Sequence, residues 1–239
     1  MKFRLMQARL PSDPVRYEER VAFAAKLQVP VEDVVSWDLL TGVDVDALTD
    51  GYDAVLVGGS GEFGVCDDAE WLPAFFDALA ELCARRTPLF GSCFGFQGLV
   101  VALGGTVRPA PEGSEVGSYE MSTTNAAAID PVFCKLPAQF TAQEGHKDMA
   151  IELPSPAVHL VRSERCEYQA LRVRNCPVWA TQFHPELSGD ENPERFARYF
   201  DIYKVVFGEE VARQKLQSMR PSPHSNSLLR HFKAYLETL

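Results

Sequence analysis

Apolar and polar residues alternate along the first half of the chain in a way that predicts strands and helices in turn. Short apolar runs are typical of buried strands at residues 3–8, 32–39, 52–59 and 88–92. Longer amphipathic stretches have helical spacing at residues 15–27, 67–88 and 94–103. Such alternation indicates βαβ units. We therefore expect an α/β fold, an open and mostly parallel sheet with helices on both faces.

Residues that favour helix ends refine these boundaries. Asp67 or Asp68 is expected to begin the second helix, whose last turn carries two arginines, where the helix dipole favours cations. Gly104 and Gly105 are expected to end the third helix.

The second half of the chain is richer in strand-forming residues and then turns helical. Residues 168–174 and 178–183 flank a turn at 175–177 and predict a hairpin. A helix is expected to begin with Asn192 as its cap and Pro193 at its first position. Residues 220–227 are expected to link it to a last helix at 228–239. The apolar stripes of these helices must be covered, by the domain itself or by another chain: Phe196, Tyr199, Phe200 and Tyr203, then Leu228, Leu229, Phe232, Tyr235 and Leu236.

Composition narrows the functional classes. With 239 residues, 46% of them hydrophobic, the chain can bury one large core without a partner. The formal net charge of -10 opposes binding to phosphate backbones or anionic membrane surfaces. No apolar stretch approaches membrane-spanning length, and the N-terminus lacks a signal-peptide pattern. We expect a cytoplasmic protein that binds neither nucleic acid nor membrane.

The six cysteines do not form a metal-binding pattern. They lack C-x-x-C pairs and histidines at ligand spacing, so we expect no metal and no cofactor. In a reducing compartment most should be inert thiols. A disulfide between Cys166 and Cys176 across the hairpin is disfavoured for the same reason.

One cysteine lies at a place where chemistry is expected. Cys93 falls between the strand at 88–92 and the helix that follows it, with Gly91 and Gly95 on either side. Such a turn exposes its residue at the sheet edge, and the helix N-terminus favours a thiolate there. The alternative is a buried structural sulfur, because cysteine is often buried.

A histidine and a carboxylate later in the chain favour the catalytic interpretation. His184 ends an apolar strand, is followed by Pro185, and precedes Glu186 by two residues. A histidine near Cys93 could take its proton, and a carboxylate behind the ring could orient it. Alone, His-Pro-Glu is also an ordinary strand-ending turn. Together with the cysteine turn it predicts a Cys-His-Glu triad.

These motifs resemble one protein family. The segments Gly91 to Gln97 (G-x-C-x-G-x-Q), Leu103 to Gly105 and Gln182 to Glu186 look like the class I, triad-type glutamine amidotransferase domain. Residues 113–117 and 145–154 are similar to segments of its GMP-synthase-like branch. The resemblance covers residues 1–190 and implies a flavodoxin-like glutaminase domain. Residues 191–239 would then be a helical extension packed on it.

The resemblance also implies roles for particular residues. It makes Cys93 the nucleophile on the γ-amide of glutamine, His184 the base and then acid, and Glu186 the orienter of His184. It makes the backbone N–H groups of Gly59 and Phe94 the oxyanion hole. It places the substrate, a small molecule, against Gln97, Gly58, His146 and Asp148.

Other interpretations remain. Residues 59–64 match the dinucleotide pattern G-x-G-x-x-G, but the pattern follows the third strand and runs into acidic residues that would oppose a pyrophosphate. A dienelactone-hydrolase-like enzyme places its acid before its histidine, and PfpI-type relatives have histidine directly after the cysteine, where Phe94 stands. Within the resembled family, ammonia could go to a separate synthetase subunit. The chain could instead be a stand-alone γ-glutamyl peptidase, or a non-catalytic regulatory module, against which the intact triad argues.

Overall fold

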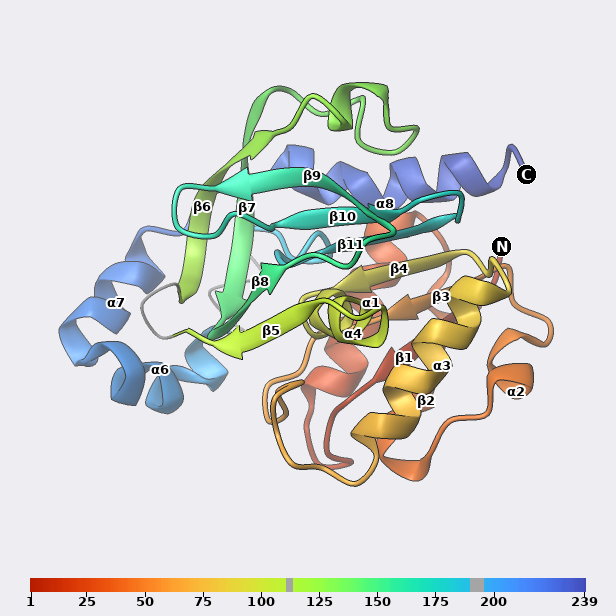
Figure 1. Ribbon diagram of the computed structural model, residues 1–239. Coiled ribbons are helices and arrows are strands. Elements are labelled where there is room, and N and C mark those ends of the chain that lie inside the picture. The colour runs from red at the N-terminus through yellow and green to blue at the C-terminus, as the bar shows by residue number, and fades with distance from the viewer. Residues whose placement is uncertain (111–113, 190–195) are drawn as a thin grey trace.

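A nine-stranded mixed sheet forms the centre of the molecule (Figure 1). The computed structural model describes residues 1–110, 114–189 and 196–239, without the side chains of residues 202, 203, 206 and 207. The strand order is β2-β1-β3-β4-β11-β10-β9-β6-β7, and β5 pairs with β8 in a separate two-stranded sheet. The bounds are β1 Phe3–Gln7, β2 Val34–Asp38, β3 Ala54–Val57, β4 Leu89–Ser92, β5 Thr106–Pro109, β6 Glu115–Thr123, β7 Gln139–His146, β8 Asp148–Glu152, β9 Ala157–Ser163, β10 Ala170–Val173 and β11 Val178–Thr181.

The sheet has a parallel part and an antiparallel part. Strands β2, β1, β3, β4 and β11 are parallel to one another, and the remaining neighbours pair antiparallel. In the parallel part, β3, β4 and β11 are buried along their whole length, as expected for strands covered on both faces. The predicted α/β fold is confirmed, and so is the hairpin of β10 and β11.

Helices cover both faces of the parallel part (Figure 1). Their bounds are α1 Val15–Leu27, α2 Val45–Thr49, α3 Leu72–Ala84, α4 Phe94–Ala102, α6 Phe200–Phe207, α7 Glu209–Gln217 and α8 Pro223–Leu236, with 3-10 turns η1 Val31–Asp33, η2 Leu39–Thr41 and η4 Ala127–Ile129. Helices α1 and α8 share one apolar cluster with the sheet, and α3 and α4 share the other. Alternate strand residues enter the two clusters: Phe90 faces α8, whereas Leu89 faces α3 and α4.

The last helix lies deep in the first of these clusters. Phe232 of α8 packs edge-on against Phe90 of β4 and Trp179 of β11, with ring centroids 5.5 and 5.9 Å apart. Leu228 and Leu229 are also fully buried. The C-terminal helix therefore contributes directly to the core beneath the strands that precede Cys93 and His184.

Two predicted boundaries were wrong. Helix α3 begins at Leu72, not at Asp67 or Asp68, because the Asp67 carboxylate accepts the Gly64 N–H at 2.6 Å and closes a turn instead. Helix α8 begins at Pro223, inside the predicted linker, since proline is well tolerated in a first turn. The predicted cap at Asn192 and Pro193 lies outside the described residues, as does the Tyr203 side chain.

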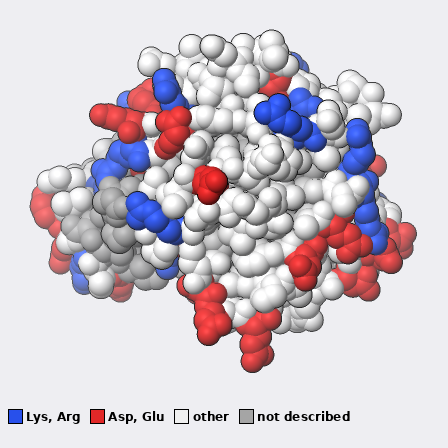
Figure 2. Space-filling model, in the orientation of Figure 1, with Lys and Arg blue, Asp and Glu red and all other residues white. Residues whose placement is uncertain are grey.

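Charged side chains of both signs lie mainly around the rim of the face shown in Figure 2, and its middle is largely uncharged. That face therefore offers no uniformly basic surface to a polyanion. Among the helices of the described residues, none is long and apolar enough to cross a membrane.

Candidate active site

Cys93 occupies a strained turn between β4 and α4. Its backbone has φ 49° and ψ −93°, a conformation that residues other than glycine rarely adopt. The Cys93 N–H donates to the Thr181 carbonyl at 2.8 Å, which ties the turn to β11. Strain of this kind persists only where the surroundings hold it, and it is concentrated at functional sites.

The two glycines around Cys93 allow this turn to close. A Cβ on Gly91 would lie 2.8 Å from the backbone carbon of Gly95, and one on Gly95 would lie 2.7 Å from the Val57 side chain. Any larger residue would push β4, α4 and β3 apart. The sequence-based interpretation of these glycines as parts of a nucleophile elbow agrees with these contacts.

His184 lies between Cys93 and Glu186, as the triad prediction requires. Its Nδ1–H donates to Glu186 Oε1 at 2.7 Å, and the ring also hydrogen-bonds to the Cys93 side chain. Burial by itself would lower the pKa of His184, but the charges of Glu186 and Cys93 and the hydrogen bonds to both outweigh it and raise this pKa to about 10. The pair is therefore arranged to hold an imidazolium beside the sulfur.

Two polar residues to which the sequence assigned no role complete this arrangement. Ser92 is fully buried and donates its hydroxyl to Glu186 Oε2 at 2.8 Å, so both carboxylate oxygens are engaged. Gln182 Nε2 lies 3.6 Å from Cys93 Sγ and donates toward it. Only their positions in the sequence could have pointed to a role: Ser92 directly precedes the nucleophile, and Gln182 precedes His184 by two residues.

The two predicted oxyanion donors differ in whether the N–H group already has an acceptor. Phe94 is the first residue of α4, so its N–H has no acceptor within the helix. The Gly59 N–H instead donates to Glu19 Oε1 at 3.0 Å. Its role in an oxyanion hole stays a prediction, and it requires this N–H to leave Glu19.

Buried hydrogen bonds hold the Glu19 carboxylate, which accepts the Gly59 N–H. Arg9 donates to both of its carboxylate oxygens, at 2.9 and 3.1 Å, and Gln7 donates to Oε2 at 2.8 Å. Arg9 also donates to Tyr199 Oη at 3.2 Å. The loop is thus connected through Arg9 to the segment that precedes α6.

The predicted substrate-binding residues lie close together but mainly contact one another. Gln97 Nε2 donates to the Asp148 carbonyl at 2.9 Å and to Gln182 Oε1 at 3.1 Å, and His146 Nδ1 lies 3.0 Å from the same carbonyl. Gly58 is apart from them: its N–H donates to the Met6 carbonyl, and a Cβ there would lie 2.6 Å from the Glu19 carboxylate. Their contact with substrate stays a prediction.

A buried polar cluster borders this group, formed by residues too far apart in sequence to be recognised from spacing. Single ligand atoms of Glu115, His146 and Cys166 lie within 4.8 Å of one another, a separation that a metal ion could bridge. His146 Nε2 is 3.2 Å from Glu115 Oε2, and Ser163 donates to Glu115 Oε1 at 2.7 Å. Burial, with the charges of Glu144 and Glu115, raises the pKa of the Cys166 thiol to about 12, which disfavours the thiolate that a metal needs.

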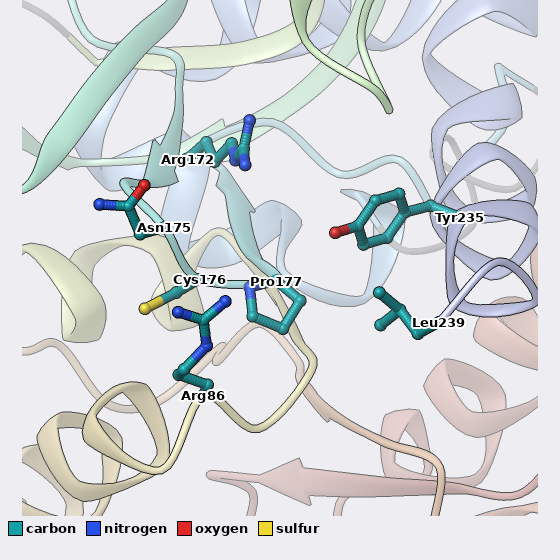
Figure 3. A pocket seen from close by; sticks show the side chains of 7 residues that line it. All are labelled: Arg86, Arg172, Asn175, Cys176, Pro177, Tyr235 and Leu239. Atoms are coloured by element: carbon teal, nitrogen blue, oxygen red, sulfur yellow. The ribbon is translucent and has the colours of Figure 1, made fainter.

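A hollow of about 450 Å³ lies elsewhere, at the turn between β10 and β11 (Figure 3). It is lined by Arg86, Arg172, Asn175, Cys176, Pro177, Tyr235 and Leu239. Arg86 and Pro177 come before the amino ends of β4 and β11, whereas Cys93 and His184 follow their carboxyl ends. The hollow is therefore at the opposite sheet edge from the triad.

Comparison with known proteins agrees with this geometry. The model of the family "Glutamine amidotransferase class-I" matches residues 24–202, and the chain belongs to this family of enzymes. It is 29% identical over 165 residues to one subunit of the glutamine-hydrolysing GMP synthase of Methanosarcina acetivorans, covering 66% of this chain and 79% of that protein. It is 32% identical over 133 residues to the GMP synthase of Thermosipho africanus, covering 54% and 24%.

Solved structures show the same fold. A glutamine amidotransferase from Thermotoga maritima superposes with a TM-score of 0.75 at 20% identity, over 99% of this chain and 97% of that one. One from Methylobacillus flagellatus has a TM-score of 0.67 at 18% identity, over 99% and 94%.

Proposed function

We propose that the chain hydrolyses the γ-amide of glutamine through a γ-glutamyl thioester on Cys93. The observation that carries the proposal is the buried Cys93, His184 and Glu186 arrangement at a strained strand-to-helix turn. A Cys-His pair with an orienting carboxylate is the minimal machinery for acyl transfer from an amide.

The first half of the reaction forms the thioester. The Cys93 thiolate attacks the γ-carbonyl carbon, and the negative charge moves to the carbonyl oxygen, which the Phe94 N–H stabilises. The C–N bond then breaks, His184 donates its Nε2 proton to the leaving nitrogen, and ammonia departs. Glu186 holds Nδ1–H throughout, so that Nε2 faces the sulfur.

The second half releases glutamate. Neutral His184 takes a proton from water as the oxygen attacks the thioester carbon. The C–S bond breaks, glutamate leaves, and the Cys93 thiolate is restored beside the imidazolium.

The ammonia is proposed to pass to a separate synthetase subunit. The relatives whose names describe one subunit of a glutamine-hydrolysing GMP synthase support this proposal. The Gly59 N–H supports it too, because an oxyanion donor held by Glu19 would keep the enzyme slow until a partner reorients the loop.

The test measures glutamate and ammonia release from glutamine and from γ-glutamyl dipeptides, with Cys93→Ser beside Cys134→Ser, a change of an exposed cysteine. We expect glutamine to release glutamate and ammonia in equal amounts, and we expect only Cys93→Ser to lose this activity. Strong dipeptide cleavage with weak glutamine hydrolysis would identify a γ-glutamyl peptidase instead. Because the isolated chain is expected to be slow, release is followed over long incubations at high protein concentration, and no release from either substrate that depends on Cys93 would refute the proposal.

A further inference from the structure

The hollow at the turn between β10 and β11 is lined by cationic and polar side chains (Figure 3). Its volume of about 450 Å³ is that of a site for a small molecule. Arg86 and Arg172 contribute two guanidinium groups, and no acidic side chain of the described chain lines it. This local positive charge contrasts with the formal net charge of -10 of the whole chain. The hollow therefore suits an anionic ligand.

Arg86 lies at a backbone position where glycine is usual. It directly follows the C-cap of α3 and has φ 58°. Its N–H donates to the Cys83 carbonyl at 3.0 Å, and the Thr87 N–H donates to the Leu82 carbonyl at 2.9 Å, which are the two hydrogen bonds of a Schellman motif. A side chain in this left-handed conformation costs free energy that glycine avoids. Because the helix end alone would favour glycine, the arginine indicates a role for its side chain.

The two guanidinium groups are not used up by other parts of the protein. Arg86 forms no hydrogen bond or ion pair with any residue that the structure describes. The buried Arg172 Nε also has no partner there, and Nη1 lies 3.7 Å from Asp130 Oδ2, beyond hydrogen-bonding distance. The Asp130 carboxylate in turn accepts three N–H groups, so its charge is only partly available to Arg172.

The hollow has a hydrogen-bonding part and an apolar part. Figure 3 shows the Arg86 guanidinium and the Tyr235 hydroxyl directed into the space between the lining side chains. Pro177 and Leu239 add aliphatic surface, and the Tyr235 ring adds an aromatic face. The carboxylate of Leu239 pairs with neither arginine in the described structure. A ligand with an anionic group and an organic part would therefore contact complementary surfaces.

We propose that this hollow binds a phosphomonoester, with its phosphate on Arg86 and Arg172 and its organic part against Tyr235. A guanidinium presents its N–H groups in a planar fork that matches phosphate oxygens. A phosphate has three terminal oxygens and close to two negative charges at neutral pH, so it matches two guanidinium groups better than a carboxylate does. The site goes beyond the proposed glutamine hydrolysis and does not depend on it, because the hollow and the triad lie at opposite sheet edges.

The test is a calorimetric titration of phenyl phosphate into the purified chain. We expect saturable binding with a dissociation constant of about 1 mM or less, which is reasonable for a ligand of this size. Inorganic phosphate should bind more weakly because it lacks the ring. Benzoate should also bind more weakly, because it keeps the ring but carries a single charge.

A glycine substitution separates binding from folding. Arg86→Gly should weaken the binding of phenyl phosphate by roughly tenfold or more, the effect of losing a charge-assisted hydrogen bond. It should not lower the melting temperature, because glycine suits φ 58°. Gln28→Gly is the backbone control, since Gln28 ends α1 with φ 56°. Arg85→Ala is the charge control, an arginine that pairs with Glu81 and Asp46. Both controls should bind phenyl phosphate as the wild type does.

Chemical labelling locates the site. Phenylglyoxal modifies accessible arginines, and phenyl phosphate should protect Arg86 but not Arg85, as read by peptide mass spectrometry. Absence of saturable binding up to about 10 mM phenyl phosphate, or unchanged binding in folded Arg86→Gly, would overturn the inference. Benzoate binding as tightly as phenyl phosphate would overturn it too, in favour of a carboxylate site. Each outcome is a binding result, so it is independent of whether glutamine is hydrolysed.

Discussion

Replacing Glu186 by glutamine tests how the carboxylate acts through His184. The substitution keeps the size of the side chain and removes its charge. With its carbonyl oxygen toward the Ser92 hydroxyl, the new amide would present NH₂ to His184 Nδ1. Nδ1 would then have to accept, which places the proton on Nε2 of a neutral ring and leaves no lone pair to act as base.

The structure gives the size of the effect. At about 1.4 kcal/mol for each pH unit, raising the pKa of His184 from 6.5 to about 10 corresponds to about 5 kcal/mol in favour of the imidazolium. Glu186 and Cys93 share this stabilisation, so we expect Glu186→Gln to lose about half of it. With the wrong tautomer added, kcat should fall by about 10²- to 10⁴-fold.

The pH profile separates this mechanism from a general loss of structure. A raised histidine pKa means that the proton stays bound until the pH rises through about 10, so activity that needs the imidazolium as acid persists up to that pH in the wild type. In Glu186→Gln the alkaline limb of kcat/KM should move to lower pH. The control is Glu167→Gln, which alters another Glu-His pair, 3.8 Å from His159, and should change neither quantity. An unchanged alkaline limb with kcat within a few-fold of wild type would refute the reasoning.

Three further changes test other parts of the account. Gly59→Ala should lower kcat by at least tenfold, because the new Cβ would lie 2.9 Å from His184 Cε1 and displace the ring; unchanged steady-state kinetics would contradict this contact. Ser92→Ala removes a hydrogen bond to a buried carboxylate and should lower the free energy of unfolding in urea by about 1.5–3 kcal/mol; a loss below 0.5 kcal/mol would argue against the bond. Phe232→Ala should cost about 3–5 kcal/mol in the same assay, whereas the exposed Ile129→Ala should cost under about 0.5; equal losses would remove α8 from the core.

Local patterns in the sequence were sufficient for β1 to β4, for the hairpin of β10 and β11, for the cysteine turn and for the His-Pro-Glu segment, but not for β5 to β9. β4 and the elbow at Cys93 follow from a buried apolar run that ends between two glycines, and α1 spans the predicted residues 15–27. These features depend on neighbours in the chain, which is why they could be predicted.

Features that depend on contacts between distant segments could not be predicted in this way. Glu19 lies in an amphipathic helix, where an acidic residue suggests the solvent face, yet it is fully buried because Arg9 and Gln7 of the β1 region donate to it. Glu115 and His146 meet only because β6 and β7 pair in this register. One local boundary was missed as well: α3 starts later than predicted, because Asp67 serves a turn rather than a helix cap.

The most direct test of the central claim is covalent labelling with the glutamine analogue 6-diazo-5-oxo-norleucine, followed by peptide mass spectrometry. Cys93 alone is held at a helix N-terminus beside a histidine base, so the account predicts one adduct per chain, on Cys93, and its loss in His184→Ala. A label on Cys66 or Cys83, or full labelling of His184→Ala at the wild-type rate, would contradict it.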